Sequence, residues 1–282
     1  MNPVIKWAGG KRRFAETIVG ILGTECNNYY EPFIGGAAIL LFMEVPNATC
    51  SDTNEELINL YNVIKHHPQE LIKELAENFV PHHSKEFYYE IRAWDRDREN
   101  YAQISNIKRA ARFMYLNRTC YNGLWRVNKQ GENNVPFGKY VNPTILVENA
   151  ILEASQYFNT SNVNFEVSDY RAIAERAQEG DIVYFDPPYD IETGQSSFVE
   201  YTQDGFTREN QRELKDLCDR LVERGVKVGI SNSNTSFIRS LYTEGPYNFY
   251  ELHDDITVKR TIGGTLDSRK ELSELFILGV RR

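Results

Sequence analysis

The sequence predicts an α/β protein in which a helix-covered sheet is interrupted by a mostly helical insertion. Two observations carry this prediction: strands and helices alternate near both ends of the 282-residue chain, and its middle has a helical, charge-rich pattern without a good buried strand. Alternating strands and helices are typical of a parallel sheet covered on both faces. We therefore expect one domain from residues 1–55 and 146–282, and a helical and hairpin lobe from residues 56–145.

The first 55 residues are predicted to run helix, strand, helix, strand. Residues 29–33 form an extended segment, which leads into the small-residue turn 34–38 and the apolar run 39–42. An extended segment, a glycine turn and an apolar helix begin a βα unit. Residues 47–52 predict a second short strand that ends in an acid.

The middle of the chain is different in character. Residues 54–107 are helical in pattern, and residues 124–135 then alternate around a Lys-Gln-Gly turn, which predicts a hairpin. Seven Lys and Arg side chains and one acid, Glu132, fall between residues 108 and 140, so this segment carries +6 in a chain of net charge −8. Such an island predicts a local polyanion-binding face or, equally, a solvated helix face.

Strands and helices alternate again from residue 163. The clearest strand covers residues 181–185, the helix after it residues 208–224, and the next strand residues 226–231. In an open α/β sheet, ligands bind beyond the carboxyl ends of the strands. The residues directly after 185 are therefore expected at a ligand site.

The composition is that of an ordinary soluble protein, with 41% hydrophobic and 26% charged residues. No stretch approaches the ~20 apolar residues that span a bilayer, and no signal peptide is visible. The four cysteines are scattered and include no CxxC pair. This pattern argues against a zinc site or a disulfide framework and predicts a cytoplasmic protein without a metal.

The tetrapeptide Asp186-Pro187-Pro188-Tyr189 occupies the expected ligand site. Two prolines fix two φ angles and remove two amide donors, so the carbonyls before and between them can accept hydrogen bonds from a ligand. Asp186 adds a carboxylate and Tyr189 an aromatic face, a set that suits a flat heterocycle with an exocyclic amine. Two acceptors out of the ring plane localise the nitrogen lone pair for attack on an electrophilic methyl group. The alternative is a rigid strand-end turn with a surface acid.

A second motif, Glu31-Pro32-Phe33-Ile34-Gly35-Gly36-Ala37, places a glycine turn after the first strand, where the backbone can approach a ligand closely. Asp52 ends the next strand about 20 residues later, where an acid can hold ribose hydroxyls. The full G-x-G-x-x-G spacing of a dinucleotide site is missing. The pattern therefore predicts a nucleoside-type ligand or, equally, a tight strand–helix turn.

A third motif, Lys6-Trp7-Ala8-Gly9-Gly10-Lys11, superficially suggests a phosphate loop. Its spacing is wrong, and Arg12 stands where Ser or Thr is required, so a nucleoside triphosphatase is rejected. Trp7 and Lys11 are candidates for a ligand pocket, with Lys11 facing a carboxylate. The alternative for Lys11 is an exposed cation near the N-terminus.

A fourth motif interleaves basic, amide and aromatic residues over 117–128 and 133–140. Arg and Lys contact guanine edges, Asn contacts adenine edges, and apolar side chains wedge between bases. The hairpin region is expected to read bases through Arg126, Asn128 and Lys139. The preceding helix is expected to meet phosphates or solvent through Lys108, Arg109 and Arg112. A polar hairpin with a partly buried aromatic residue is the alternative.

Together these motifs resemble the Dam-like (D12 class) family of DNA adenine-N6 methyltransferases. KWAGGK, EPFIGGA, a recognition insertion and DPPY follow in that family's order across nearly the whole chain, and YNGL-R-N followed by NVPFGKY is particularly specific. The resemblance implies a Rossmann-like S-adenosylmethionine-dependent methyltransferase sheet with an inserted helical and β-hairpin DNA-recognition lobe. It also implies methyl transfer from S-adenosylmethionine to the N6 amine of an adenine flipped out of double-stranded DNA.

The resemblance assigns roles to particular residues and implies no metal. The catalytic residues are Asp186, Pro187 and Tyr189. Trp7, Lys11, Asp52 and Asp186 match the family's cofactor-binding positions, and Asp169 is a weaker candidate for the adenine side of the cofactor. Glu31, Phe33 and Gly35 of the second motif are further cofactor-binding candidates. The residues that match DNA-contacting positions are Lys6, Tyr121, Asn122, Leu124, Arg126, Asn128, Pro136 and Lys139, and Arg118 of the fourth motif is a further DNA-binding candidate. Beyond DNA, a cognate restriction endonuclease is an expected functional partner without a stable complex.

The family commonly methylates adenine in GATC, so GATC or a related short site is expected. Lys139 departs from the Arg of some members, and Lys contacts guanine without a planar fork. Alternative activities are methylation of cytosine in DNA, adenine in RNA or a glutamine side chain. Asp before Pro-Pro-Tyr favours adenine. A DNA-binding protein with an inactive methyltransferase fold is a further alternative, against which the intact Asp186, Tyr189, Lys11 and Asp52 count.

Overall fold

The computed structural model describes residues 1–191, 206–244, 248–256 and 274–281. Their strands form a seven-stranded sheet in the order β3-β2-β1-β4-β5-β7-β6. The chain divides into two compact units, of which unit 1 comprises residues 1–12 and 34–168 and unit 2 comprises residues 13–33 and 169–282. The predicted α/β class is confirmed.

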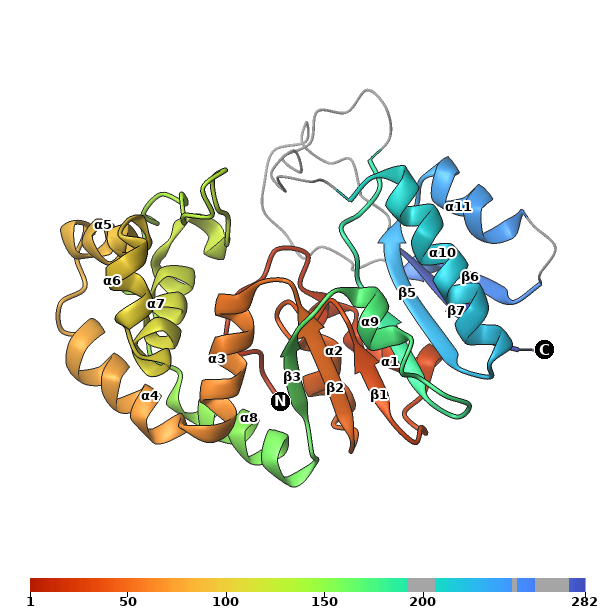
Figure 1. Ribbon diagram of the computed structural model, residues 1–282, viewed down its shortest axis with the longest axis horizontal. Helices are drawn as coiled ribbons and strands as arrows, with labels where there is room; N and C mark the ends of the chain where they lie inside the picture. Colours follow the sequence, from red (N-terminus) through yellow and green to blue (C-terminus); the bar gives the residue numbers. More distant parts are fainter. Residues whose placement is uncertain (192–205, 245–247, 257–273, 282) are drawn as a thin grey trace. The chain divides into compact units, whose positions relative to one another are not determined.

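Unit 1 combines a pair of strands with a group of helices (Figure 1). The strands β2 (Ala48–Asp52) and β3 (Asn164–Val167) run parallel. The helices are α2 (Ala38–Met43), α3 (Glu55–His66), α4 (Pro68–Glu74), the π-helix η2 (Leu75–Phe79), α5 (Lys85–Ala93), the 3₁₀ helix η3 (Trp94–Arg96), α6 (Arg98–Gln103), α7 (Asn106–Thr119), the 3₁₀ turn η4 (Tyr121–Gly123) and α8 (Glu148–Thr160).

Local sequence explains the two helices at the centre of this group. The Asn54 side chain caps α3 by accepting a hydrogen bond from the Leu57 N–H at 3.2 Å, and Ser105 caps α7 through the Lys108 N–H at 3.4 Å. α3 buries an apolar face, whereas α7 is buried all round over residues 110–117, where Phe113 is completely buried. The prediction that residues 54–107 are helical is confirmed.

Unit 2 contains the rest of the strands. They are β1 (Tyr29–Glu31), β4 (Ile182–Phe185), β5 (Lys227–Ser233), β6 (Tyr250–Ile256) and β7 (Glu274–Gly279). The helices are α1 (Ala15–Leu22), α9 (Tyr170–Ala174), α10 (Arg208–Glu223) and α11 (Ser236–Thr243). The 3₁₀ helix η1 (Lys11–Arg13) contains the point at which the chain leaves unit 1 and enters unit 2.

The core of unit 2 forms between β4, β5 and α10. All four residues of β4 are buried, which explains their uninterrupted apolar sequence. Thr207 and Asn210 begin α10 with a capping box, and one face of α10 buries Leu214, Leu217 and Leu221. The strand and helix predicted at 181–185 and 208–224 are confirmed to within one residue.

The expected parallel pairing holds for β1, β4 and β5 but not for β6 and β7. β4 runs parallel to β1 and β5, but β7 runs antiparallel to both β5 and β6. The prediction extrapolated from the strands at 181–185 and 226–231, which are parallel. A short buried apolar strand has the same residue pattern in either direction, so the sequence of β7 could not specify its orientation.

Within the described ranges, no helix is long and apolar enough to cross a membrane. The same residues contain no cluster of three or more His, Cys, Asp or Glu side chains suited to holding a metal ion.

Candidate functional site

The tetrapeptide Asp186–Tyr189 leaves the carboxyl end of β4 in unit 2. Phe185 and Pro187 are buried, whereas Asp186 and Tyr189 are partly exposed. β4 lies between β1 and β5 and runs parallel to both. The tetrapeptide therefore occupies the sheet edge at which α/β proteins bind ligands, as the sequence predicted.

Two further candidate residues leave the sheet at the same edge, because β1 and β4 are parallel neighbours. Glu31 is 2% exposed and accepts a hydrogen bond from the Tyr29 hydroxyl at 2.7 Å. The Phe33 ring stacks on Tyr170 with centroids 5.3 Å apart. Unit 2 thus gathers a buried carboxylate and an aromatic ring beside the tetrapeptide.

The surroundings of Tyr189 make its phenol harder to ionise than that of a free tyrosine. Burial and, second, the negative charge of Asp186 raise the pKa of the Tyr189 phenol. The same two causes raise the pKa of Tyr184 on β4. A phenol whose pKa is raised stays protonated at neutral pH, so Tyr189 presents a neutral aromatic ring beside a carboxyl group.

Asp190 holds the end of this loop, although the sequence analysis did not single it out. Its carboxylate is 5% exposed and accepts two hydrogen bonds from the Arg208 guanidinium, at 2.9 and 3.2 Å, and one from the Thr235 hydroxyl at 2.7 Å. A second acid directly after the motif was the available signal. Its partners lie 18 and 45 residues further along the chain, so spacing could not identify them.

Asp169 stands at the start of α9, where its side chain accepts a hydrogen bond from the Arg171 N–H at 2.9 Å. It also pairs with the Arg171 guanidinium at 3.3 Å, and its side chain is 48% exposed. These contacts are those of a helix cap. Its assignment to the cofactor stays a prediction.

Unit 1 brings together three other candidates, Trp7, Gly35 and Asp52. The Gly35 N–H donates to an Asp52 carboxylate oxygen at 3.4 Å. Gly35 has φ +43°, and a Cβ there would lie 2.6 Å from the Trp7 indole nitrogen, so only glycine fits. Burial raises the pKa of Asp52, opposed by N–H donors that include Asn54 and Gly35. The glycine turn and the strand-end acid, separate in sequence, therefore form one group.

Lys11 is 3% exposed, and its ammonium donates to the Gly9 carbonyl at 2.5 Å. The alternative of an exposed cation is therefore wrong. A buried ammonium requires acceptors or counter-charges, which is compatible with the predicted role of Lys11 in facing a carboxylate.

All predicted DNA-binding residues belong to unit 1. Buried Asn117 joins two of their segments: its side chain accepts from the Lys6 N–H at 2.9 Å and donates to the carbonyls of Lys6 at 2.7 Å and Gly123 at 3.1 Å. The turn at Asn122 uses left-handed backbone, φ 54°. The Lys6 ammonium lies 4.3 Å from the centroid of the Tyr140 ring.

The predicted hairpin is present as a short antiparallel turn. Val127 and Asn133 form an antiparallel bridge, and the Asn134 N–H donates to the Arg126 carbonyl at 3.1 Å. Gly131 has φ +79°, which explains the glycine in the turn. Residues 124–135 contain no continuous strand among the elements that the structure describes.

Two candidate base-reading residues make contacts inside this hairpin. The Asn128 side-chain oxygen accepts from the N–H groups of Gln130 and Glu132, each at 3.0 Å, and its amide donates to the Glu132 carboxylate at 2.8 Å. The Arg126 guanidinium donates to the Asn134 side chain at 2.6 Å. Asn128 therefore builds the turn, and a base contact would require it to exchange partners.

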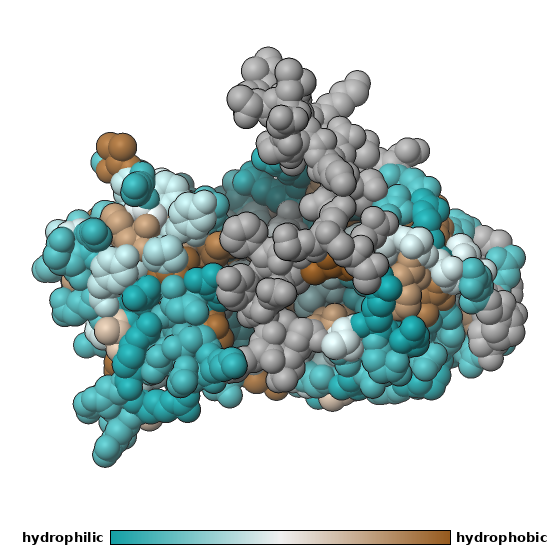
Figure 2. Space-filling model, turned by 90° about the horizontal axis from the view of Figure 1, so that it is seen from above, coloured by the Kyte–Doolittle hydropathy of each residue, from teal (hydrophilic) through white to brown (hydrophobic). Residues whose placement is uncertain are grey.

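On the face shown in Figure 2, the described surface is mostly hydrophilic and carries apolar side chains in several separate places. Several exposed apolar side chains come from the fourth motif or directly after it: Tyr121 (54% exposed), Val127 (39%), Tyr140 (37%) and Val141 (94%). Asn122, Pro136 and Lys139 are also exposed, and Leu124 is partly buried. This segment of unit 1 thus presents aromatic, apolar and cationic side chains together, as wedging and base contacts require.

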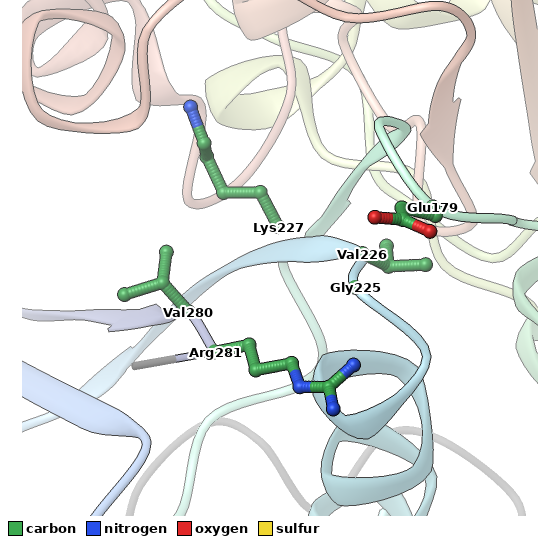
Figure 3. Close-up of a pocket in the computed structure, with 6 residues that line it drawn as sticks. All are labelled: Glu179, Gly225, Val226, Lys227, Val280 and Arg281. Atoms are coloured by element: carbon green, nitrogen blue, oxygen red, sulfur yellow. The ribbon is translucent and has the colours of Figure 1, made fainter.

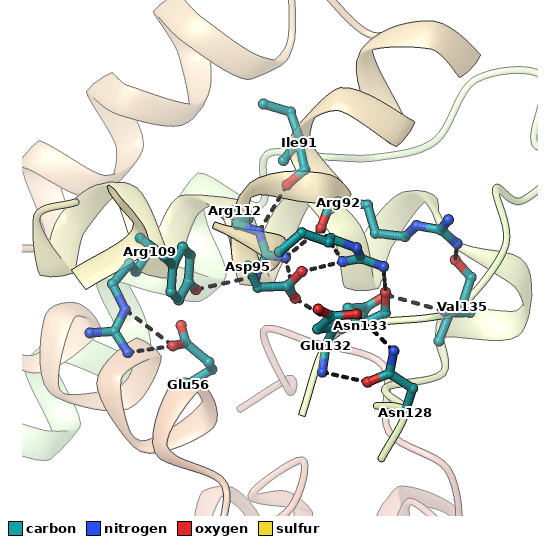
Figure 4. Close-up of polar contacts among 12 residues, drawn as sticks. Glu56, Ile91, Arg92, Asp95, Arg109, Arg112, Asn128, Glu132, Asn133 and Val135 are labelled. Atoms are coloured by element: carbon teal, nitrogen blue, oxygen red, sulfur yellow. Dashed lines mark hydrogen bonds and ion pairs between the residues drawn. The ribbon is translucent and has the colours of Figure 1, made fainter. Parts of the chain in front are cut away.

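The expectation that Arg112 meets phosphates or solvent is wrong (Figure 4), whereas 22% of the Arg109 side chain is exposed and its expected contact stays a prediction. Arg112 is 1% exposed and donates to the Ile91 and Arg92 carbonyls, at 2.9 and 2.8 Å, and to the Asp95 carboxylate at 2.6 Å. Arg109 pairs with Glu56. Helical spacing shows which residues share a face, but the tertiary partners decide whether that face is buried.

Arg118 also contacts protein. Its guanidinium donates to the Val4 carbonyl at 2.6 and 3.2 Å and to the Thr144 carbonyl at 3.4 Å, and burial lowers its pKa. The DNA contact assigned to Arg118 stays a prediction. Lys108, at the start of the same helix, is exposed.

A surface hollow of about 480 Å³ lies elsewhere in unit 2 (Figure 3). It is lined by Glu179, Gly225, Val226, Lys227, Val280 and Arg281. Lys227 begins β5, so the hollow is at the amino end of that strand, opposite to the edge that carries Asp186. No predicted site residue lines it.

Comparison with known proteins agrees with the motifs. The family model described as D12 class N6 adenine-specific DNA methyltransferase matches residues 7–258. The chain is 38% identical to the Type II methyltransferase M1.LlaDCHI of Lactococcus lactis subsp. cremoris, over 98% of this chain and 95% of the relative.

Two other relatives match with similar coverage. Identity is 37% to the Type II methyltransferase M.MjaIII of Methanocaldococcus jannaschii, over 99% of both chains. It is 35% to the DNA adenine methylase of Escherichia coli K12, over 97% of this chain and 94% of the relative. The seven-stranded α/β sheet is consistent with an S-adenosylmethionine-dependent methyltransferase fold. The expected resemblance is confirmed, and the chain belongs to the D12 class of N6 adenine-specific DNA methyltransferases.

Proposed function

We propose that this chain is a site-specific DNA methyltransferase that transfers a methyl group from S-adenosylmethionine to the N6 amine of a flipped adenine in double-stranded DNA. The observation that carries the proposal is the Asp186–Tyr189 loop at the carboxyl end of β4. This loop offers a carboxylate and a neutral aromatic ring at the sheet edge where ligands bind. The family membership of the chain supports the same reaction.

The loop supplies two acceptors for the adenine amine. The Asp186 carboxylate accepts one N–H bond, and the Pro187 carbonyl, between the prolines, accepts the other. The Pro188 carbonyl accepts a hydrogen bond from Gln211 at 3.0 Å, so the fold itself uses it. Two acceptors out of the base plane localise the N6 lone pair, which makes this poor nucleophile reactive.

The chemistry of the other candidates fits S-adenosylmethionine, which supplies an electrophilic methyl group when bound. Asp52, oriented by the Gly35 N–H, holds ribose hydroxyls. The buried Lys11 ammonium faces the carboxylate of the methionine part. Trp7 and Phe33 offer aromatic faces, and Glu31 and Asp169 complete the proposed contacts.

Adenine in a duplex is paired and stacked, so a sheet-edge loop reaches its amine only after the base is flipped out. Tyr189 stacks on the extruded base in this proposal. Fluorescent 2-aminopurine at the target position should brighten when stoichiometric enzyme binds. Unchanged fluorescence with fully active enzyme would contradict flipping.

We assign DNA recognition to residues 56–145 and catalysis to residues 1–55 and 146–282. The exposed Tyr121, Asn122, Pro136 and Lys139 are the proposed outer contacts, and Lys6, Leu124, Arg126, Asn128 and Arg118 complete the set. The proposed target is GATC or a related short site. A cytoplasmic location and functional pairing with a restriction endonuclease are parts of the same proposal.

A base-specific assay tests the reaction. Purified protein with labelled S-adenosylmethionine should methylate adenine in duplex DNA, and nucleoside analysis should identify N6-methyladenine. Methylcytosine, methylated RNA adenine or methylated glutamine would each replace the proposal with an alternative. DNA binding without cofactor binding and turnover would indicate an inactive methyltransferase fold.

A further inference from the structure

One polar side chain interrupts the apolar face of α10. Gln211 is completely buried on the face that also buries Leu214, Leu217 and Leu221. A buried amide is costly unless its donor and acceptor are both bonded. Its hydrogen bonds therefore indicate what Gln211 contributes at a position where the helix pattern favours an apolar residue.

Gln211 forms a relay with Asn232 on β5, which is also completely buried. The Gln211 amide nitrogen donates to the Pro188 carbonyl at 3.0 Å, and its oxygen accepts from the Asn232 amide at 3.0 Å. The Asn232 oxygen accepts from the Asp190 N–H at 3.1 Å. The relay therefore holds the main chain on both sides of Tyr189.

The two anchors of the relay are rigid elements. α10 has 16 residues, and β5 pairs with both β4 and β7. Hydrogen bonds from rigid elements can fix the backbone of a loop, and a fixed backbone places the side chains of that loop accurately. We propose, on the basis of the proposed function above, that Gln211 and Asn232 are positioning residues that set Tyr189 and the neighbouring acceptors for the flipped adenine.

This role differs from a general contribution to stability. Misplacement of reacting groups by about 1 Å can lower a rate by about 100-fold. Loss of the relay should therefore slow methyl transfer while leaving the affinities for DNA and cofactor nearly unchanged. A purely structural role would lower stability without this selective loss of rate.

Gln211→Met has a similar length and no amide, so it removes the relay with little change in volume. Its single-turnover methylation rate should fall about 10- to 100-fold, with dissociation constants for DNA and S-adenosylmethionine within threefold of wild type. Leu221→Ala is the matched control, because it damages the same helix face away from the loop. It should lower Tm and keep a rate within threefold of wild type.

Gln211→Glu adds a second readout. A protonated carboxyl can supply the one donor and the one acceptor that the Gln211 amide uses in the relay, whereas a carboxylate has only acceptors and cannot donate to the Pro188 carbonyl. The rate of this variant relative to wild type should therefore fall as pH rises, and the same ratio for Leu221→Ala should stay flat.

The inference is overturned if folded Gln211→Met keeps a rate within threefold of wild type, or if Leu221→Ala loses rate to the same degree. If Gln211→Met does not fold, Gln211→Glu decides alone, and a pH-independent ratio overturns the inference. Wild-type enzyme without adenine methylation would refute the proposed function instead, so the two failures are distinguishable.

Discussion

Arg112→Met should destabilise the protein and leave the electrostatics of DNA binding unchanged. The wild-type guanidinium is 1% exposed and bonds two backbone carbonyls and the Asp95 carboxylate. Removing one partner of a buried ion pair costs about 3–5 kcal/mol. In this variant the Asp95 carboxylate still accepts a hydrogen bond from the Asn133 N–H at 2.8 Å and still pairs with Arg96. We therefore expect a loss of unfolding free energy at the lower end of that range, about 3 kcal/mol.

Thermal unfolding measures this effect directly. For a chain of this size, about 3 kcal/mol corresponds to a fall in Tm of roughly 5 °C. Lys108→Met is the matched control, because Lys108 is exposed on the same helix. It should keep its Tm and, if it contacts a phosphate, reduce the slope of log affinity against log salt by about 0.9. An Arg112→Met protein with unchanged Tm and a reduced salt slope would refute the structural role of Arg112.

Three further substitutions test the site. Asp186→Ala should lower the single-turnover methylation rate by more than about 100-fold, because the adenine amine loses its charged acceptor. Circular dichroism and DNA binding should be unchanged. A rate within tenfold of wild type would exclude the assigned role of Asp186. Gly35→Ala should weaken cofactor binding in calorimetry, because its Cβ would collide with Trp7; unchanged affinity would argue against a cofactor site at this turn. Arg126→Ala should lose about 1–3 kcal/mol of discrimination at one base pair, measured as methylation rates on the preferred site and its single-base variants, and equal slowing on all sites would remove Arg126 from base reading.

Local sequence predicted those parts of the fold that depend on nearby residues. An apolar run predicts the buried strand β4, and helical periodicity predicts the amphipathic helix α10. The direction of β7 depends on how distant strands pair, and its own residues do not encode that choice. The antiparallel direction of β7 was therefore the part of the sheet that the sequence did not predict.

The same distinction applies to the site. The position of Asp186 follows from the end of one strand, and the structure places it there. Asp190 and Gln211 act through partners 18 to 45 residues away, so no local pattern reveals their contacts. Arg112 shows that a local pattern can also mislead. Its spacing is that of a surface cation, but its guanidinium is buried and donates to the Ile91 carbonyl and the Asp95 carboxylate.

The most direct test of the central claim is long-read detection of modified bases in DNA from cells that express this chain. Host cells without their own adenine methylation provide the background, and cells that express Asp186→Ala provide the matched control. The account predicts N6-methyladenine at one short sequence, GATC or a close relative, only with the wild-type chain. Modified cytosine, adenine methylation without a sequence preference, or no modification from a folded, expressed wild-type chain would contradict it.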